Sequence, residues 1–342
     1  MSHTVFVSGG SGYIAGFLIR QLVAEGWTVH TSVRSLATEA QVRELLQVDN
    51  RRLRFFAADL NVDAGWAEAM AGCSHVAHVA SPLPMGAPKN ADELIVPARD
   101  GALRALRAAK AAGVRRFVMT SSVAAIAYGR GRGVHHFTEA DWTDLSKPGA
   151  RKEISAYIQS KTVAEKAARE WMATEGGTME FVSICPSVVL GPVLSRDYSA
   201  SLVIVKKLLD GSLGACPDIG FGVVDVRDVA DLHVRALNAP GIAGERFIAN
   251  DRFMKLGEIA DVLRSKLGAE AHKVTTRQVP DWMVRVTALF VPLAKAVVGE
   301  LGSVRHQSPA HAKAVLGWQA RPAEQSIVDA ARSLLDQGLV KR

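Results

Sequence analysis

The sequence predicts an α/β fold: a doubly wound parallel sheet with a smaller mixed α/β region attached. Two observations support this prediction. Short apolar runs alternate with segments of helical periodicity over the first half of the chain, and a glycine cluster follows the first apolar run. Strands separated by helices run parallel, because each helical crossover returns the chain to the same edge of the sheet. Helices then cover both faces of that sheet.

The expected strands of the main sheet are short apolar runs, several of them rich in β-branched residues. They cover residues 5–8, 27–33, 53–57, 76–79, 116–120 and 180–185. Between the first two, Ile14, Leu18 and Leu22 recur at helical spacing before Gly26, and 98–112 is another helical segment. After residue 185 the alternation weakens. The later elements are a strand at 245–249 and helices at 256–267 and 323–335.

Composition excludes several classes of protein. Hydrophobic residues make up 48% and charged residues 22%, which is typical of a folded chain rather than a disordered one. The net charge of +7 is spread along the chain, so we interpret it as a solvated surface rather than a nucleic-acid site. Cys73, Cys185 and Cys216 form no CxxC pair and the histidines no HExxH pair, so we expect neither disulfides nor a metal site.

The chain enters its first strand without a signal-peptide pattern, and we therefore predict a soluble, cytoplasmic protein. One late apolar stretch, 279–301, needs a separate interpretation because it carries Asp281, Arg285, Lys295 and Glu300. Its apolar residues recur near helical spacing: Trp282, Val286, Leu289, Phe290, Leu293 and Val297. We predict an amphipathic helix pair packed within the smaller region, with a dimer face or a membrane-surface contact as alternatives.

The glycine cluster predicts a phosphate-binding turn. Gly9, Gly10, Ser11 and Gly12 lie between the first strand and the first helix, where glycine permits positive φ and close approach of backbone N–H groups. Ala15 stands at the third small position of the usual spacing. A purely structural turn is the alternative, but its place after the first strand favours a dinucleotide pyrophosphate.

Two later strand ends bear on the choice of dinucleotide. Arg34 follows the second strand, where an acidic residue would otherwise bind a ribose 2′-hydroxyl, and its guanidinium suits a 2′-phosphate. We therefore predict NADP(H), with NAD(H) possible. Asp59, followed by Leu60, comes after the third strand and is placed to accept from the adenine amino group. A helix N-cap is the alternative role for Asp59.

A candidate catalytic group comes from two further segments. Tyr157 and Lys161 are four residues apart on a predicted helix and so share one face. A neighbouring ammonium stabilises a phenolate and lets tyrosine act as an acid or base near neutral pH. Ser122 follows the strand 116–120 at the carboxyl edge of the sheet, where it could donate to a substrate oxygen. Together the three predict a site for hydride transfer to a carbonyl.

These motifs resemble the extended short-chain dehydrogenase/reductase superfamily with its Rossmann sheet, over nearly the whole chain. The segments that carry the resemblance are Val7-Ser8-Gly9-Gly10-Ser11-Gly12-Tyr13-Ile14, Thr120-Ser121-Ser122 and Tyr157-x-x-Ser160-Lys161. Residues 31–34, 78–82 and 186–192 are most similar to dihydroflavonol 4-reductase and related aldehyde or ketone reductases. Gly317-Trp318 and the turn at 224–230 also resemble the family and are expected to be structural. Ala127 departs from it, because plant flavonoid reductases carry a substrate-binding asparagine there.

The motifs and the resemblance together imply a set of site residues. The catalytic residues would be Ser122, Tyr157 and Lys161. The cofactor-binding residues would be Gly9, Gly10, Ser11, Gly12, Tyr13, Ile14, Arg34, Asp59, Leu60, Val79, Ala80, Ser81, Thr120, Tyr157, Lys161, Pro186, Ser187, Val188 and Val189. We expect residues 1–186, completed by parts of 223–250, to bind NADP, and 187–222 and 250–342 to bind the substrate.

The predicted function is reversible NADPH-dependent reduction of aldehydes or ketones, with hydride from nicotinamide C4 and a proton from Tyr157. Three alternatives remain open: a nucleotide-sugar epimerase or dehydratase with bound NAD, a 3β-hydroxysteroid-type dehydrogenase, and a non-catalytic NADP-sensing regulator. The expected partner is a small carbonyl compound, with no nucleic acid and no membrane span, and the chain is expected to be a monomer or homodimer.

Overall fold

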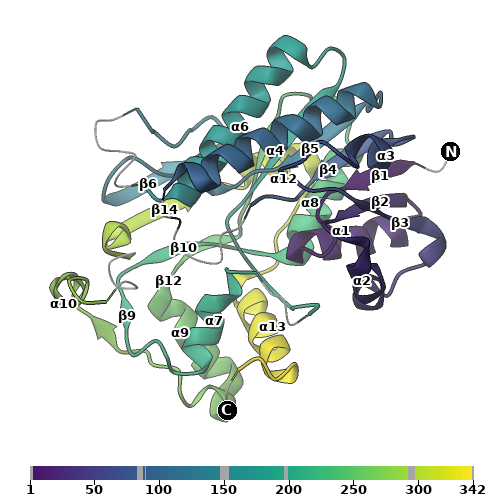
Figure 1. Ribbon diagram of the computed structural model, residues 1–342. Helices are drawn as coiled ribbons and strands as arrows, with labels where there is room; N and C mark the ends of the chain where they lie inside the picture. The colour runs from purple at the N-terminus through teal and green to yellow at the C-terminus, as the bar shows by residue number, and fades with distance from the viewer. Residues whose placement is uncertain are drawn as a thin grey trace.

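A seven-stranded parallel sheet forms the centre of the protein (Figure 1). The computed structural model describes residues 3–82, 88, 90–146, 154–195, 199–291 and 297–340. The strands of this sheet are β1 (Thr4–Val7), β2 (Thr28–Val33), β3 (Leu53–Ala57), β4 (His75–His78), β5 (Arg116–Thr120), β7 (Glu180–Pro186) and β11 (Arg246–Ala249). Their order is β11-β7-β5-β4-β1-β2-β3, and every neighbouring pair is parallel. The predicted doubly wound sheet is confirmed, and its order reverses between β1 and β4, where such sheets bind ligands.

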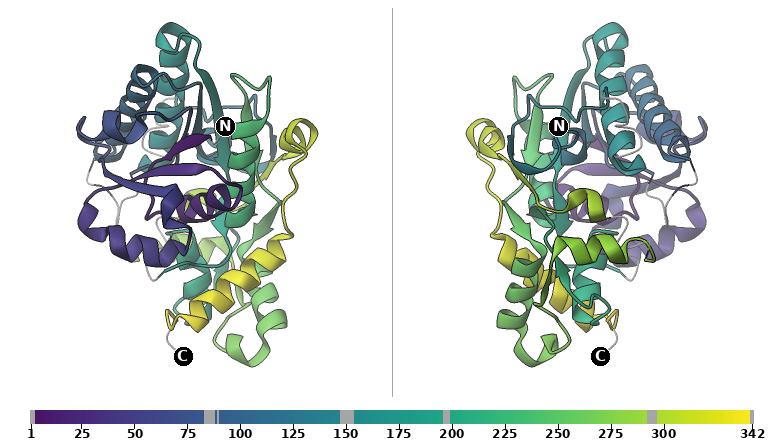
Figure 2. Two further views of the ribbon diagram at one scale, coloured as in Figure 1. Left: turned by 90° about the vertical axis from the view of Figure 1, so that its right-hand side faces the viewer. Right: turned by 90° about the vertical axis from the view of Figure 1, so that its left-hand side faces the viewer.

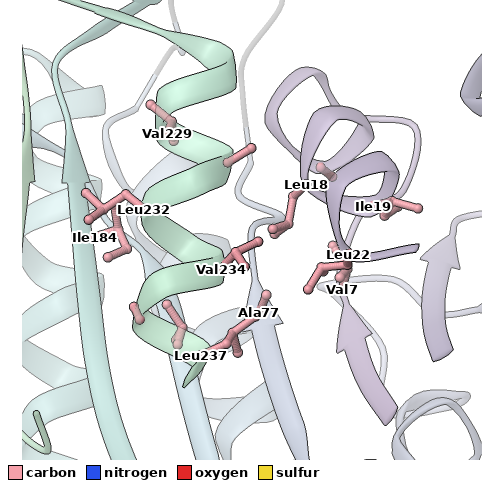
Figure 3. Packing of buried hydrophobic residues seen from close by; sticks show 14 of the residues in the cluster. Val7, Leu18, Ile19, Leu22, Ala77, Ile184, Val229, Leu232, Val234 and Leu237 are labelled. Carbon is pink, nitrogen blue, oxygen red and sulfur yellow. The ribbon is translucent and has the colours of Figure 1, made fainter. Parts of the chain in front are cut away.

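Helices pack on both faces of this sheet. One face is covered by α1 (Tyr13–Ala24) and α8 (Val226–Asn238), the other by α3 (Trp66–Met70), α4 (Asp92–Ala111) and α6 (Ala156–Glu175). The helix α2 (Glu39–Leu46) links β2 to β3, and α12 (Ala310–Leu316) contacts α8 and β11. Leu18 and Leu22, one turn apart on α1, are fully buried. Figure 3 shows them between Val7 and helix α8, as the apolar spacing predicts.

The smaller region has its own sheet and core. A mixed sheet joins β8 (Val188–Leu190), β10 (Gly220–Asp225) and β12 (Arg252–Lys255). The helices α7 (Leu202–Leu209), α9 (Leu256–Leu267) and α13 (Ala323–Asp336) gather beside it (Figures 1 and 2). Two strand pairs complete the region: β6 (Gly133–Phe137) with β14 (Ser303–Gln307), and β9 (Cys216–Pro217) with β13 (Gln278–Val279). Leu208, Leu263 and Leu334 are fully buried between these helices, in a cluster distinct from that under α1 and α8.

The late apolar stretch differs from its prediction. The structure describes one short helix, α10 (Asp281–Thr287), and a 3₁₀ turn at Val298–Glu300, while Leu293 lies outside the described residues. Trp282, Leu289 and Phe290 are 65%, 77% and 81% exposed. The prediction that their side chains pack within the smaller region is therefore wrong. Helical spacing identifies an apolar face but not what covers it. Among the described helices none is long and apolar enough to span a membrane.

Two glycines beside α3 allow a test of what the backbone there requires. Gly65 has φ +86°, and a β-carbon would come 1.8 Å from the Ala57 carbonyl oxygen; Gly72 has φ +72° with nothing within 4 Å. We expect Gly65→Ala to lower the free energy of unfolding by about 2 kcal/mol or more, and Gly72→Ala by about 1 kcal/mol. Urea unfolding followed by circular dichroism measures both. If the two variants lose the same free energy of unfolding, the positive φ of Gly65 requires glycine there, and the contact with the Ala57 carbonyl oxygen adds nothing.

Candidate active site

The turn after β1 has the shape of a phosphate cradle. Gly9 has φ +73°, and a β-carbon there would come 3.0 Å from that of Ala80; at Gly10 it would lie 2.4 Å from Thr31 Oγ1. Gly12 is the N-cap of α1 and provides no side-chain cap, and the first turn of α1 carries no acidic residue. The first N–H groups of a helix lack intrahelical partners and carry partial positive charge. The predicted residues therefore form a site that suits a pyrophosphate.

Ser8 joins the two strand ends at the point where the strand order reverses. Its Oγ accepts hydrogen bonds from the N–H groups of Val79 and Ala80, each at 2.9 Å, and lies 3.1 Å from His78 Nδ1. Burial, followed by the charge of Lys161, lowers the pKa of His78 to about 3, so its ring is neutral. Ser8 thus fixes the segment 79–81 beside the glycine turn. No spacing in the sequence indicates this role of Ser8, because its partners lie at the end of a distant strand.

Arg34 and Asp59 lie beyond the ends of β2 and β3. Arg34 is exposed, and within the described residues its guanidinium makes no hydrogen bond or ion pair. Asp59 Oδ1 accepts from the backbone N–H and the side-chain amide of Asn61, at 2.8 and 2.9 Å. The alternative role of Asp59 as a helix N-cap is wrong, because the N-cap of the following helix is Gly65. Leu60 is half-buried and lies against Gly101 of α4.

Ser122, Tyr157 and Lys161 come together at the carboxyl edge of the sheet. Ser122 follows β5, where its Oγ accepts from the Ala124 N–H at 3.1 Å and hydrogen-bonds with the Tyr157 side chain. Tyr157 and Lys161 lie on the first turns of α6, with Lys161 Nζ 5.9 Å from the centre of the tyrosine ring. A strand end and a helix start thus bring a hydroxyl, a phenol and an ammonium into one place. This is the arrangement that the spacing predicts.

Burial sets the charge states of this group. It raises the pKa of Tyr157, and the hydrogen bond with Ser122 acts in the opposite direction. It lowers the pKa of Lys161 to about 8, against the raising effects of Cys185 and Glu165. Near neutral pH the phenol therefore carries its proton and the amine is charged. A protonated phenol beside an ammonium can give its proton to a developing alkoxide, because the ammonium stabilises the phenolate that remains.

The segment after β7 borders the catalytic group. Ser122 Oγ lies 3.5 Å from the Pro186 carbonyl oxygen, and Ser187 Oγ donates to the Ala249 carbonyl at 3.2 Å. Val188 and Val189 are the first residues of β8, so the segment 186–189 leads from the end of β7 in the main sheet into the smaller sheet. Thr120 differs from the other predicted residues. Its Oγ1 is 2.7 Å from His233 Nε2 on α8, on the face of the sheet opposite to Tyr157.

Tyr128 is a further neighbour of this group, and no motif in the sequence points to it. Burial raises its pKa to about 12, with further effects from the charges of Glu300, Arg305 and Tyr157. The Arg305 guanidinium stacks on the Tyr128 ring, 4.4 Å from its centre, and donates to Glu300 Oε2 at 2.6 Å. No spacing in the sequence links position 128 to β14, since the fold alone brings them together.

The chain matches a known family. A model of the NAD dependent epimerase/dehydratase family matches residues 5–248, and the chain belongs to that family. It is similar to dihydroflavonol 4-reductase of Gerbera hybrida, 31% identical over 77% of this chain and 72% of that protein. It is also similar to cinnamoyl-CoA reductase CAD2 of Medicago truncatula, 33% identical over 77% of this chain and 81% of that protein. The predicted resemblance to dihydroflavonol 4-reductase-like reductases of the extended superfamily is confirmed.

A solved structure matches almost the whole chain. The yeast methylglyoxal/isovaleraldehyde reductase Gre2, complexed with NADPH, superimposes with a TM-score of 0.80 at 23% identity, over 98% of this chain and all of that one. At this identity the likeness establishes the fold, including the part of the smaller region beyond residue 248 that the family model does not cover. The fold class predicted from the sequence is thereby confirmed.

Proposed function

We propose that the protein is an NADPH-dependent reductase that converts an aldehyde or ketone reversibly to the alcohol. The observation that carries the proposal is the convergence of Ser122, Tyr157 and Lys161 at the carboxyl edge of the sheet, beside the point where its strand order reverses. The relatives named above, reductases at 31% and 33% identity, support the same reaction class.

The described residues fit NADPH as cofactor. The uncapped start of α1, with Gly9, Gly10, Ser11, Gly12, Tyr13 and Ile14, would hold the pyrophosphate. Arg34 would bind the 2′-phosphate, Asp59 and Leu60 the adenine, and the segment 79–81 the path between adenosine and nicotinamide. Thr120 would contribute its backbone, since its hydroxyl is engaged by His233. Lys161 would bind the nicotinamide ribose and 186–189 would border the nicotinamide, whose C4 supplies the hydride when the cofactor is bound.

Each catalytic side chain then has one task. Ser122 and the Tyr157 phenol donate hydrogen bonds to the carbonyl oxygen of the substrate, which polarises the carbon. Tyr157 passes its proton to that oxygen as negative charge develops. The ammonium of Lys161 stabilises the phenolate, and bulk solvent returns the proton afterwards. Residues 187–222 and 250–342, with their separate core, are proposed to bind the remainder of the substrate.

The proposal is tested by following NADPH oxidation with the purified protein. A panel of aromatic aldehydes, β-keto esters and bulky cyclic ketones covers different shapes of carbonyl compound. We expect turnover with at least one of these classes. Copurification of tightly bound NAD, together with no consumption of NADPH across the panel, would reject this function in favour of the epimerase or dehydratase alternative.

The choice of cofactor is tested at Arg34. A charged hydrogen bond to a phosphate contributes about 1.5–3 kcal/mol, so we expect Arg34→Ala to raise the Kd for NADPH by about 10- to 100-fold. The Kd for NADH should change little, because NADH has no 2′-phosphate. Arg54→Ala, at an exposed position of neighbouring β3, is the matched control. Similar losses for NADPH and NADH in Arg34→Ala would remove the proposed role.

A further inference from the structure

A fully buried carboxylate lies beneath the candidate active site. Glu165 of α6 is 0% exposed and accepts from Arg246 Nε at 2.8 Å and Nη2 at 3.1 Å, and from Arg169 Nε at 3.1 Å. Two hydroxyls also donate to it, Ser121 Oγ at 2.5 Å and Ser183 Oγ at 2.7 Å. The residues of this network therefore lie on α6, β7 and β11 and directly after the end of β5.

The network is built to keep this carboxylate charged. Burial alone would raise the pKa of Glu165, but the charge of Arg246 and the hydrogen bonds around it lower it below its ordinary value. Arg246 is itself fixed, since its guanidinium lies 3.9 Å from the centre of the Trp142 ring and donates to the Glu139 and Asp141 carbonyls at 2.7 Å. Removing a carboxylate from water costs free energy, and a buried carboxylate stays ionised only when its ion pairs and hydrogen bonds offset that cost.

The network joins the two segments that carry the catalytic group. Glu165 lies one helical turn beyond Lys161 on the same face of α6, and two turns beyond Tyr157. Ser121, which donates to Glu165, immediately precedes Ser122 at the end of β5. The hydrogen bond from Ser121 thus ties the strand end to the helix at the point where their side chains meet.

Two groups raise the pKa of Lys161, Cys185 and then Glu165, and of these only Glu165 carries a negative charge at neutral pH. Among the described residues, the other titratable groups that act on or face this amine come from three elements: His78 at the end of β4, Cys185 on β7, and Tyr157 on α6 itself. Burial keeps all three uncharged at neutral pH, since the pKa of His78 is about 3, that of Cys185 is about 12 and that of Tyr157 is raised.

We propose that Glu165 is a positioning residue of this site. Its negative charge keeps the Lys161 amine protonated, and its hydrogen bond with Ser121 holds the end of β5 against α6. This inference rests on the proposed reductase function, which needs a charged Lys161 beside Tyr157. Neither role requires Glu165 to touch substrate or cofactor.

The direct test is a titration of Lys161 in the protein without cofactor. In protein labelled with ¹³C at lysine Cε, the Lys161 signal is identified by its loss in Lys161→Met, and its shift is followed from pH 6 to 11. Glu165→Gln keeps the shape and removes the charge, so we expect the midpoint to fall from about 8 by about one pH unit. The alkaline limb of the pH profile of kcat/KM should move down with it.

Two variants separate this effect from a general loss of stability. Glu165→Asp keeps the charge and should restore the midpoint toward that of the wild type. Glu180→Gln breaks a different ion pair, between β5 and β7, in which Arg116 Nε donates to Glu180 Oε2 at 2.6 Å. This pair lies at the end of β5 that is opposite to Ser122. The variant should lower stability without moving the midpoint. An unchanged midpoint in Glu165→Gln, or an equal fall in Glu180→Gln, overturns the electrostatic role.

Two further variants cover the remaining cases. If Glu165→Gln does not fold, Arg169→Gln removes a positive partner of the carboxylate and should raise the Lys161 midpoint; a fall or no change contradicts the proposal. Ser121→Ala should lower kcat severalfold with an unchanged midpoint, and full activity would remove the positioning role. Because the titration needs no turnover, it tests the charge effect even if no carbonyl of the panel is reduced, which would instead reject the proposed function.

Discussion

Replacing Tyr157 by phenylalanine is expected to lower kcat for carbonyl reduction by about 1,000-fold. The change removes one oxygen atom, and with it both the proton donor and a hydrogen bond to the reacting oxygen. The pKa of Tyr157 is raised by burial, so the phenol holds its proton at neutral pH. When Tyr157 loses its proton, the ammonium of Lys161 stabilises the phenolate. A deprotonated Ser122 or a hydroxide ion is not stabilised in this way, so neither can replace Tyr157.

Steady-state kinetics and a direct binding measurement together check this expectation. The Kd for NADPH in Tyr157→Phe, followed by cofactor fluorescence, should stay close to that of the wild type, because the ring remains in place. Tyr128→Phe is the matched control, since it removes another buried phenolic oxygen in the same neighbourhood and should keep most of the activity. Turnover that survives in Tyr157→Phe, or equal losses in both variants, would contradict the assignment of Tyr157 as the proton donor.

The main sheet could be predicted closely because its strands carry a strong local signal. The runs at 53–57 and 116–120 coincide with β3 and β5, whose ends are set by turn residues on either side of an apolar segment. The start of α4 was predicted six residues too late, at 98 rather than at Asp92. Pro97 lies inside this helix, and burial of Leu94 and Ile95 outweighs the hydrogen bond that proline removes.

In the candidate site, too, the residues that could be predicted are those marked by local spacing, and the partners distant in the chain could not be predicted. Tyr157 and Lys161 could be paired from a spacing of four on a predicted helix, and Ser122 from its place after a strand. The partners of Glu165 could not be found in this way, because Arg246 is 81 residues away in the chain and only the order of strands brings it close. Periodicity describes one element at a time, whereas this network depends on how four elements meet. The catalytic and cofactor-binding roles, the domain boundaries, a cytoplasmic location and a monomeric or dimeric state stay predictions.

The largest expected loss of stability comes from Trp318, which resembles a family signature and lies far from the catalytic group in the chain. Its side chain is 1% exposed, and its Nε1 donates to the Asp228 carbonyl oxygen at 2.8 Å. It packs with Leu316 into the cluster under α1 and α8, so a segment near the C-terminus completes the core of the first half of the chain. We expect Trp318→Ala to lower the free energy of unfolding by about 4 kcal/mol.

Trp318→Phe separates packing from hydrogen bonding at this position. It keeps most of the apolar volume but leaves the buried Asp228 carbonyl without its donor, so a loss of about 2 kcal/mol is expected. Urea unfolding followed by circular dichroism gives both values, and kcat measured well below the unfolding transition should change little in either variant. If Trp318→Ala costs no more than Trp318→Phe, the apolar contacts of the Trp318 ring contribute nothing beyond the hydrogen bond that both variants lose, and the C-terminal segment is held mainly by its polar contacts. Among these is the bond that Asp228 Oδ2 accepts from the Arg321 N–H at 2.6 Å.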